Sequence, residues 1–206
     1  YVLHHSEASI VLTSPELLPL IDSVRGKLAH LKQVVVTGAG EFAGALSWDK
    51  FLSGAAAEAP RIPLDPEDLA SITYTSGTTD RPKGVMLSQY AYAFAPRMRA
   101  QGLGWNESDR VLCVLPLFHV NALCHTCIAM LSVGGSIVLT EKFSASRFWD
   151  EVIASEATVM LYVGTILSII KKLGNPPPGH RIRVGMGVGG TPVLREWFEG
   201  HLGIAL

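Results

Sequence analysis

Short apolar runs alternate with amphipathic segments along almost the whole chain. The runs are rich in β-branched residues, which is typical of buried strands, and the longer segments repeat apolar residues at helical spacing. The predicted strands are Ser9–Thr13, Gln33–Thr37, Ser71–Thr75, Arg110–Leu115, Ser136–Thr140, Thr158–Tyr162 and Arg183–Val188. The predicted helices are Ser14–His30, Trp48–Ala57, Ser88–Gly102, Asn121–Val133, Ser144–Glu156, Thr165–Leu173 and Leu194–Leu202. This alternation predicts an α/β fold, in which a mostly parallel sheet is flanked by helices on both faces.

The composition agrees with a globular chain. Apolar residues make up 48% of the 206 residues and charged residues 17%, which excludes a disordered tail or a coiled coil. Lys and Arg total 17 against 18 Asp and Glu. This balance provides no electrostatic footprint for nucleic acid or anionic lipid, so we expect neither as a partner.

The longest apolar stretches are Ile128–Leu139 and Ala157–Ile170. Both are shorter than the roughly 20 residues that span a bilayer, so we expect no membrane insertion. Three cysteines is an odd and sparse count, which indicates a reducing compartment rather than a disulfide scaffold. We therefore expect a cytoplasmic protein.

The segment Tyr74–Gly84 carries the strongest chemical signal. It reads Tyr-Thr-Ser-Gly-Thr-Thr-Asp-Arg-Pro-Lys-Gly and follows a predicted strand. Its hydroxyls and exposed backbone N–H groups can donate hydrogen bonds to phosphate oxygens, and Lys83 adds a positive charge. It is not a Walker A loop, because that pattern requires Gly where Pro82 stands. On composition alone, a surface turn rich in Ser and Thr remains an alternative.

Residues 75–84 resemble the phosphate loop of the AMP-forming acyl-CoA synthetases, which has the form Thr-Ser-Gly-Thr-Thr-Gly-x-Pro-Lys-Gly. The resemblance continues in Leu115–His119, which is similar to a second core motif of that family, and in Gly189–Pro192, which is similar to its Gly-Gly-Ala-Pro turn. Glu141–Ala145 and Phe148-Trp149 are most similar to the carnitine/crotonobetaine-CoA ligase branch.

The resemblance implies a two-step ligase reaction in fatty acid metabolism or a related pathway. A small-molecule carboxylic acid would react with ATP and Mg²⁺ to give an acyl-adenylate, and coenzyme A would then take the acyl group. It implies His119 and Lys83 as catalytic residues and no protein metal site among these motifs. The nucleotide-binding residues that it implies are Thr75, Ser76, Gly77, Thr78, Thr79, Lys83, Gly84, Gly189, Gly190, Thr191 and Pro192.

Two positions depart from the family pattern. Asp80 stands where the family has Gly or Ser, so it brings a negative charge towards a polyphosphate and disfavours a backbone with positive φ. We hypothesise that it weakens ATP binding. Gly164 stands where relatives usually have Pro, near the expected wall of the acyl pocket.

The resemblance also predicts the domain organisation. Residues 1–206 would form part of a large N-terminal AMP-binding domain, with residues 1–61 as a first βα portion and 62–206 carrying the phosphate loop and acyl pocket. The family's Tyr-Gly-x-Thr-Glu motif and C-terminal domain are not in the sequence, so we expect these residues alone to be an inactive piece. The acid and the oligomeric state do not follow from the sequence.

Two other functions stay open. The chain could be a non-catalytic domain that binds nucleotide or a partner, with the phosphate loop disabled by Asp80. It could also be an NAD-dependent dehydrogenase, because Gly38–Ala43 matches Gly-x-Gly-x-x-Gly/Ala after a strand and Asp65 follows. Cys124 and Cys127, with His125 between them, favour buried structural roles over a zinc or redox site.

Overall fold

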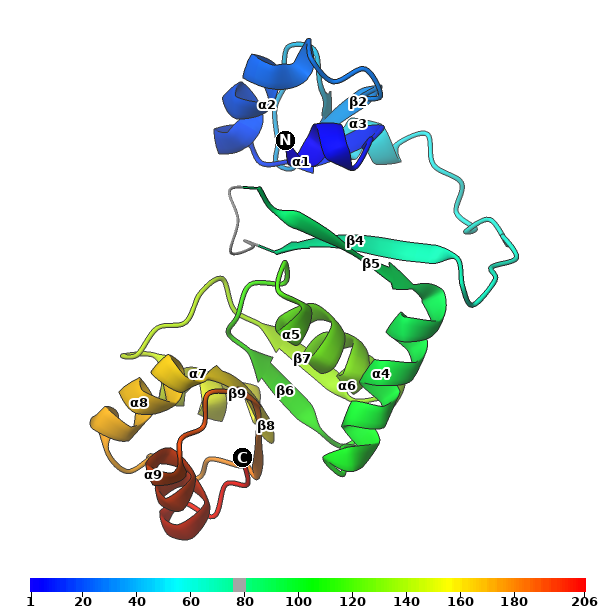
Figure 1. Cartoon of the computed structure of the whole chain (residues 1–206). Coiled ribbons are helices and arrows are strands. Elements are labelled where there is room, and N and C mark those ends of the chain that lie inside the picture. The colour runs from blue at the N-terminus through cyan, green and yellow to red at the C-terminus, as the bar shows by residue number, and fades with distance from the viewer. Residues whose placement is uncertain (76–80) are drawn as a thin grey trace. The chain divides into compact units, whose positions relative to one another are not determined.

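The computed structural model describes residues 1–75 and 81–206 and divides the chain into two compact units (Figure 1). The first unit comprises Tyr1–Asp65 and Ile72–Met86. The second comprises Pro66–Ser71 and Leu87–Leu206. Within the described residues, no helix combines the length and the apolar character needed to cross a membrane.

The first unit contains a small parallel sheet of order β1-β2-β3. Val34, Val35 and Val36 of β2 are fully buried at its centre, since β2 has a neighbour on each side. The elements are α1 (Val2–His5), β1 (Ile10–Thr13), a 3₁₀ turn (Pro15–Leu17), α2 (Leu18–Arg25), β2 (Gln33–Val36), β3 (Leu46–Ser47) and α3 (Trp48–Leu52).

The strands β4 (Leu69–Thr75) and β5 (Lys83–Ser88) form a separate two-stranded sheet on either side of the phosphate-loop motif. β5 was not predicted, because only its three residues Val85–Leu87 form an apolar run. Ser88 begins α4 (Gln89–Gly102), as predicted, and its Oγ accepts a hydrogen bond from the Ala91 N–H at 3.3 Å. This is the usual N-cap interaction.

The second unit is built on a parallel four-stranded sheet of order β7-β6-β8-β9. Its strands are β6 (Arg110–Cys113), β7 (Ser136–Leu139), β8 (Val159–Val163) and β9 (Val184–Val188). Its helices after α4 are α5 (Val120–Ala122), the π-helix η2 (Leu123–Ile128), α6 (Ala129–Ser132), α7 (Phe148–Ser155), α8 (Gly164–Leu173), α9 (Pro192–Arg195) and the π-helix η3 (Glu196–His201).

Helices cover both faces of this sheet, because alternate side chains of its strands pack against different helices. On one face, Leu112 of β6 and Met160 of β8 pack in a core with Phe148 of α7 and Leu167 of α8. On the other face, Val111 of β6 and Val159 of β8 pack in a second core with helical residues. These residues are Ala100 of α4 and Ala122, Cys127 and Met130 from the α5–α6 segment. Successive side chains of a strand point to opposite faces, so the predicted fold class is confirmed.

The boundaries of several helices differ from the prediction. α2 ends at Arg25 instead of His30, because Gly26 follows at its C-cap, and α3 ends at Leu52 rather than Ala57. The predicted helix Asn121–Val133 contains the π-helix η2 in its middle. The sequence does not distinguish this π-helix from an α-helix, because the spacing of apolar residues is similar in both.

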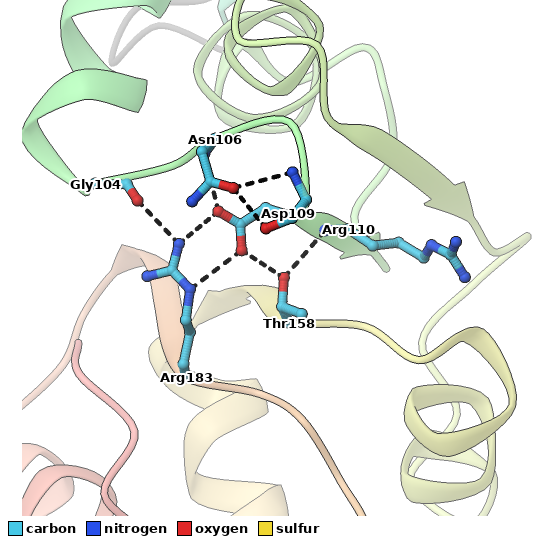
Figure 2. Close-up of polar contacts among 7 residues, drawn as sticks. Gly104, Asn106, Asp109, Arg110, Thr158 and Arg183 are labelled. Carbon is cyan, nitrogen blue, oxygen red and sulfur yellow. Dashed lines mark hydrogen bonds and ion pairs between the residues drawn. The ribbon is translucent and has the colours of Figure 1, made fainter.

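The amino ends of three strands of the large sheet are joined by one buried carboxylate, Asp109 (Figure 2). Its side chain is 2% exposed and pairs with Arg183, which precedes β9. Its Oδ1 accepts from Arg183 Nε at 3.1 Å and from Thr158 Oγ1, which precedes β8, at 2.7 Å. Its Oδ2 accepts from the Asn106 N–H at 3.0 Å.

The same network extends to the backbone. Arg183 Nη2 also donates to the Gly104 carbonyl at 3.0 Å, and Thr158 Oγ1 accepts from the Arg110 N–H at 3.0 Å. Burial alone would raise the pKa of Asp109, but the hydrogen bonds from Arg183, Thr158 and Asn106 outweigh it and hold this pKa below its usual value. Asp109 is therefore held as a carboxylate, and its bonds join the strands at the amino edge of the sheet.

Candidate functional site

The carboxyl ends of β6, β8 and β9 meet at the opposite edge of the sheet, because the strands are parallel. The chain leaves β6 for β7 on one side and later returns past β6 to place β8 on the other side. Open α/β sheets bind their ligands outside the carboxyl ends at such a reversal of strand order. Gly189–Pro192 follows β9 directly, and His119 ends the loop after β6, so the fold brings two of the predicted groups to one edge.

His119 ends the loop after β6 and is the N-cap of α5. Its backbone is held on both sides: its N–H donates to the Pro116 carbonyl at 3.1 Å, and its carbonyl accepts from the Ala122 and Leu123 N–H groups at 3.0 Å. The imidazole is exposed and lies against the Phe118 ring, with 4.4 Å between the ring centroids. The backbone at His119 is thus held in place, while its ring stays accessible.

The turn Gly189–Pro192 connects β9 to α9. Gly189 has a φ of 84°, in the region that favours glycine, which explains why the motif needs that residue there. Thr191 Oγ1 accepts a hydrogen bond from the Leu194 N–H at 3.4 Å, and Pro192 occupies the first turn of the helix. Thr191 is consequently an N-cap whose hydroxyl proton is left to donate to a ligand.

Gly164 and Gly189 bring the ends of β8 and β9 into direct backbone contact. A methyl group placed on Gly164 would lie 2.4 Å from the Gly189 carbonyl oxygen, so a side chain fits only if the turn moves. The departure at Gly164, which had no explanation in the sequence, therefore corresponds to a close approach between two neighbouring strand ends.

The flanks of the phosphate-loop motif lie in the first unit. Of the predicted residues, Thr75 ends β4 and Lys83 begins β5, and both are exposed. Gly84 packs against Ile72 and Tyr74, since a methyl group on it would lie 2.8 Å from Ile72 Cγ2. Ser76, Gly77, Thr78, Thr79 and Asp80 lie outside the described residues.

His5 of α1 and its N-cap residue Tyr1 contact the two flanks of this motif, which the sequence did not predict. The His5 ring nitrogen Nδ1 and the Tyr74 hydroxyl are 2.7 Å apart. On the other flank, the Arg81 guanidinium lies over the Tyr1 ring, 5.8 Å from its centroid. Arg81 thereby joins Lys83 as a second positive charge beside the loop.

The dinucleotide alternative lacks a structural requirement. That fingerprint needs a helix that begins at the glycine-rich turn, with its N-terminus on the pyrophosphate. After Gly38 and Gly40, the chain instead forms a bridge between Phe42 and Ala45 and then enters β3. The structure therefore contradicts the NAD interpretation of this segment.

The cysteines are free thiols and all three are buried. Cys113 and Cys127 belong to the same hydrophobic core. In the described part of the chain, no group of three His, Cys, Asp or Glu side chains is arranged to hold a metal ion.

Arg195 and Glu199 are exposed, and both bind the backbone of Leu206. Arg195 Nη1 donates to the Leu206 carbonyl at 2.6 Å, and the Leu206 N–H donates to Glu199 Oε1 at 3.1 Å. These bonds hold Ala205 in a parallel bridge with Val184 of β9. Sequence analysis missed this role because the partner is backbone.

Comparison with known proteins gives concordant results. Residues 1–204 match the family model described as AMP-binding enzyme. The crotonobetaine/carnitine–CoA ligase of Shigella sonnei is 33% identical over 194 residues, which cover 89% of this chain and 37% of that relative. The chain thus spans little more than a third of the length of this curated relative.

Two solved structures share the fold. An anthranilate CoA ligase in complex with anthranoyl-AMP matches with a TM-score of 0.87 at 24% identity, over 100% of this chain and 41% of that one. ATP-bound MatB from Rhodopseudomonas palustris matches with a TM-score of 0.77 at 23% identity, over 97% of this chain and 41% of that one.

Proposed function

The chain belongs to the AMP-binding enzyme family, and we propose that its protein is an AMP-forming acid–CoA ligase of the cytoplasm. A carboxylate oxygen of a small-molecule acid attacks the α-phosphorus of ATP, forming an acyl-adenylate as pyrophosphate leaves. The sulfur of coenzyme A then attacks the acyl carbon, and AMP leaves. The observation that carries this proposal is the position of His119 and the Gly189–Thr191 turn at the carboxyl ends of β6 and β9.

Each part of the motif set has a role that suits its chemistry. Thr75–Thr79 and Lys83 donate hydrogen bonds to the β- and γ-phosphates, where Lys83 also offsets negative charge. Gly189, Gly190 and Thr191 contact the adenosine through backbone groups and the Thr191 hydroxyl. His119 lies at the junction of the acyl group and the α-phosphate, where it orients the attacking carboxylate. Such chemistry depends mainly on positioning and charge stabilisation.

Magnesium would accompany ATP in this reaction, bound to phosphate oxygens. Among the described residues, no three His, Cys, Asp or Glu side chains are grouped to hold a metal ion.

The direct test is ligand-dependent stability. We expect ATP·Mg²⁺ and AMP to raise the unfolding midpoint of the chain, and NAD to leave it unchanged. A ligand at one hundred times its dissociation constant adds about 2.7 kcal/mol of stability, which a thermal scan resolves readily. Lys83→Met should weaken ATP binding at least tenfold, or by about 1.4 kcal/mol, and should weaken AMP binding much less. Lys172→Met, which changes an exposed lysine outside the motifs, is the matched control.

The same scan separates the alternative of a disabled phosphate loop. If Asp80 only weakens binding, Asp80→Gly should bind ATP more tightly than the parent chain while AMP affinity changes little. If neither the parent chain nor Asp80→Gly binds ATP or AMP, the ligase proposal is contradicted and a partner-binding domain is favoured.

A further inference from the structure

A cavity of about 530 Å³ lies in the second unit between α4 and the π-helix η2, and the turn after β9 does not line it. Its walls are mainly apolar and include Phe94, Met98 and Leu103. Two polar side chains, Arg99 and His125, complete it. None of the motifs discussed above accounts for this cavity.

The apolar wall continues along one face of α4. Tyr90, Phe94 and Met98 follow each other at intervals of four residues, and each is about half exposed, at 51%, 49% and 51%. Tyr90 and Phe94 stack with 5.1 Å between ring centroids and 12° between ring planes. A helix face with large ordered apolar side chains beside a cavity suits an apolar ligand.

The two polar groups differ in state. Burial lowers the pKa of His125, and the positive charge of Arg99 lowers it further, so the imidazole is neutral near pH 7. Its Nδ1 is shielded from solvent and lacks a hydrogen-bond partner within the described part of the chain. Arg99 has no carboxylate within ion-pair distance there either. The cavity thus combines one uncompensated positive charge with one unused ring nitrogen.

The π-helix explains how His125 reaches this cavity. Cys124, Thr126 and Cys127 on either side of it are buried in the protein core. The Thr126 hydroxyl donates to the Asn121 carbonyl, five residues earlier, at 2.8 Å, which stabilises the wider turn. Such widened turns are frequent at functional sites.

We propose that this cavity binds the tail of a carboxylic acid substrate whose far end carries a second anionic group, held by Arg99 and His125. The inference rests on the ligase function proposed above, with the reacting carboxylate at His119. Six residues separate His119 from His125, which corresponds to at most about 9 Å along the chain, because a regular α-helix rises 1.5 Å per residue and the wider π-helix rises less. A straight-chain dicarboxylic acid of medium length, such as octanedioate, spans that distance.

The test compares octanedioate with octanoate, which differ only in the second carboxylate, by calorimetric titration of the whole chain. We expect octanedioate to bind about tenfold more tightly, the effect of one charge-assisted hydrogen bond. Arg99→Gln should abolish this preference and Arg99→Lys should keep part of it. Arg97→Gln is the matched control, because Arg97 lies on the same helix, is exposed and does not line the cavity.

Several results would overturn the inference. They are equal affinity for the two acids, binding of neither acid at millimolar concentrations, or equal losses in Arg97→Gln and Arg99→Gln. The nucleotide scan keeps the two proposals apart. AMP binding without a preference for the diacid removes this inference and leaves the ligase function intact. Diacid binding without nucleotide binding leaves a diacid-binding cavity but removes the ligase function, and with it the assignment of the diacid as a ligase substrate.

Discussion

The two edges of the four-stranded sheet are built in opposite ways. At the amino edge, Asp109 is buried and fully engaged, with Arg183, Thr158 and Asn106 as its partners. At the carboxyl edge, glycines bring backbone close to backbone, and His119 and Thr191 are exposed. At the amino edge the polar side chains bind one another and join the strands. At the carboxyl edge the polar side chains remain available to a ligand. The amino edge, closed by these bonds, therefore fixes the strands whose carboxyl ends are open and hold the candidate site.

The largest expected effect is on the closed edge. Arg183→Ala leaves the buried Asp109 carboxylate without its counter-ion, which should reduce the free energy of unfolding by about 3 kcal/mol. Arg181→Ala is the matched control, because Arg181 pairs with Glu156 at 3.4 Å where both side chains are more than half exposed. It should lose less than about 1 kcal/mol. Urea unfolding measures both, and equal losses would contradict the comparison.

Acid should weaken the closed edge with a defined sign. The folded-state pKa of Asp109 lies below its unfolded value, which is about 3.9. Its stabilising contribution is therefore present above that value and is lost as pH falls through the folded pKa. We expect the stability difference between the parent chain and Arg183→Ala to shrink below about pH 4. A difference that is constant from pH 7 to pH 3 would show that the ion pair does not titrate.

The open edge should respond to a single methyl group. Gly164→Ala places Cβ against the Gly189 carbonyl, so we expect a loss of about 1–3 kcal/mol together with weaker AMP binding, because the turn must move. Gly102→Ala and Gly200→Ala are controls at helical positions with nothing within 4 Å of the added carbon. These should be neutral or stabilising by up to about 1 kcal/mol. Unchanged AMP affinity in Gly164→Ala would separate this contact from the site.

The smallest effect is expected at the cap of α9. Thr191→Ala removes the acceptor for the Leu194 N–H and should cost about 1 kcal/mol. Thr191→Ser retains the oxygen, so both its stability and its AMP affinity should stay near those of the parent chain. If Thr191→Ala and Thr191→Ser bind AMP equally, the hydroxyl has a capping role only.

The sequence predicted what depends on local pattern. The buried strands were located because residues such as Val34 and Val159 lie in short β-branched runs. His119 and Gly189–Pro192 were proposed as site residues because their segments resemble motifs of the AMP-forming acyl-CoA synthetases. The pair Asp109–Arg183 was not predictable, since its partners are 74 positions apart and meet only through the register of β6, β8 and β9.

Other features depend on contacts that no single segment encodes. The approach of Gly164 to Gly189 needs two strand ends side by side, and the partnership of Arg99 with His125 needs α4 packed against η2. Side chains that act across elements become visible only once the fold is known.

The widened turn Leu123–Ile128 has a consequence for insertions and deletions. It holds one residue more than an α-helical path would need. Deleting one residue inside it should restore regular α-helical winding and leave the buried face of α6 in place. The position of His125 in the cavity wall should change. The same deletion elsewhere in the helix would rotate every later residue by about 100°. This segment is therefore a place where a one-residue length change could remodel a cavity wall without rebuilding the core.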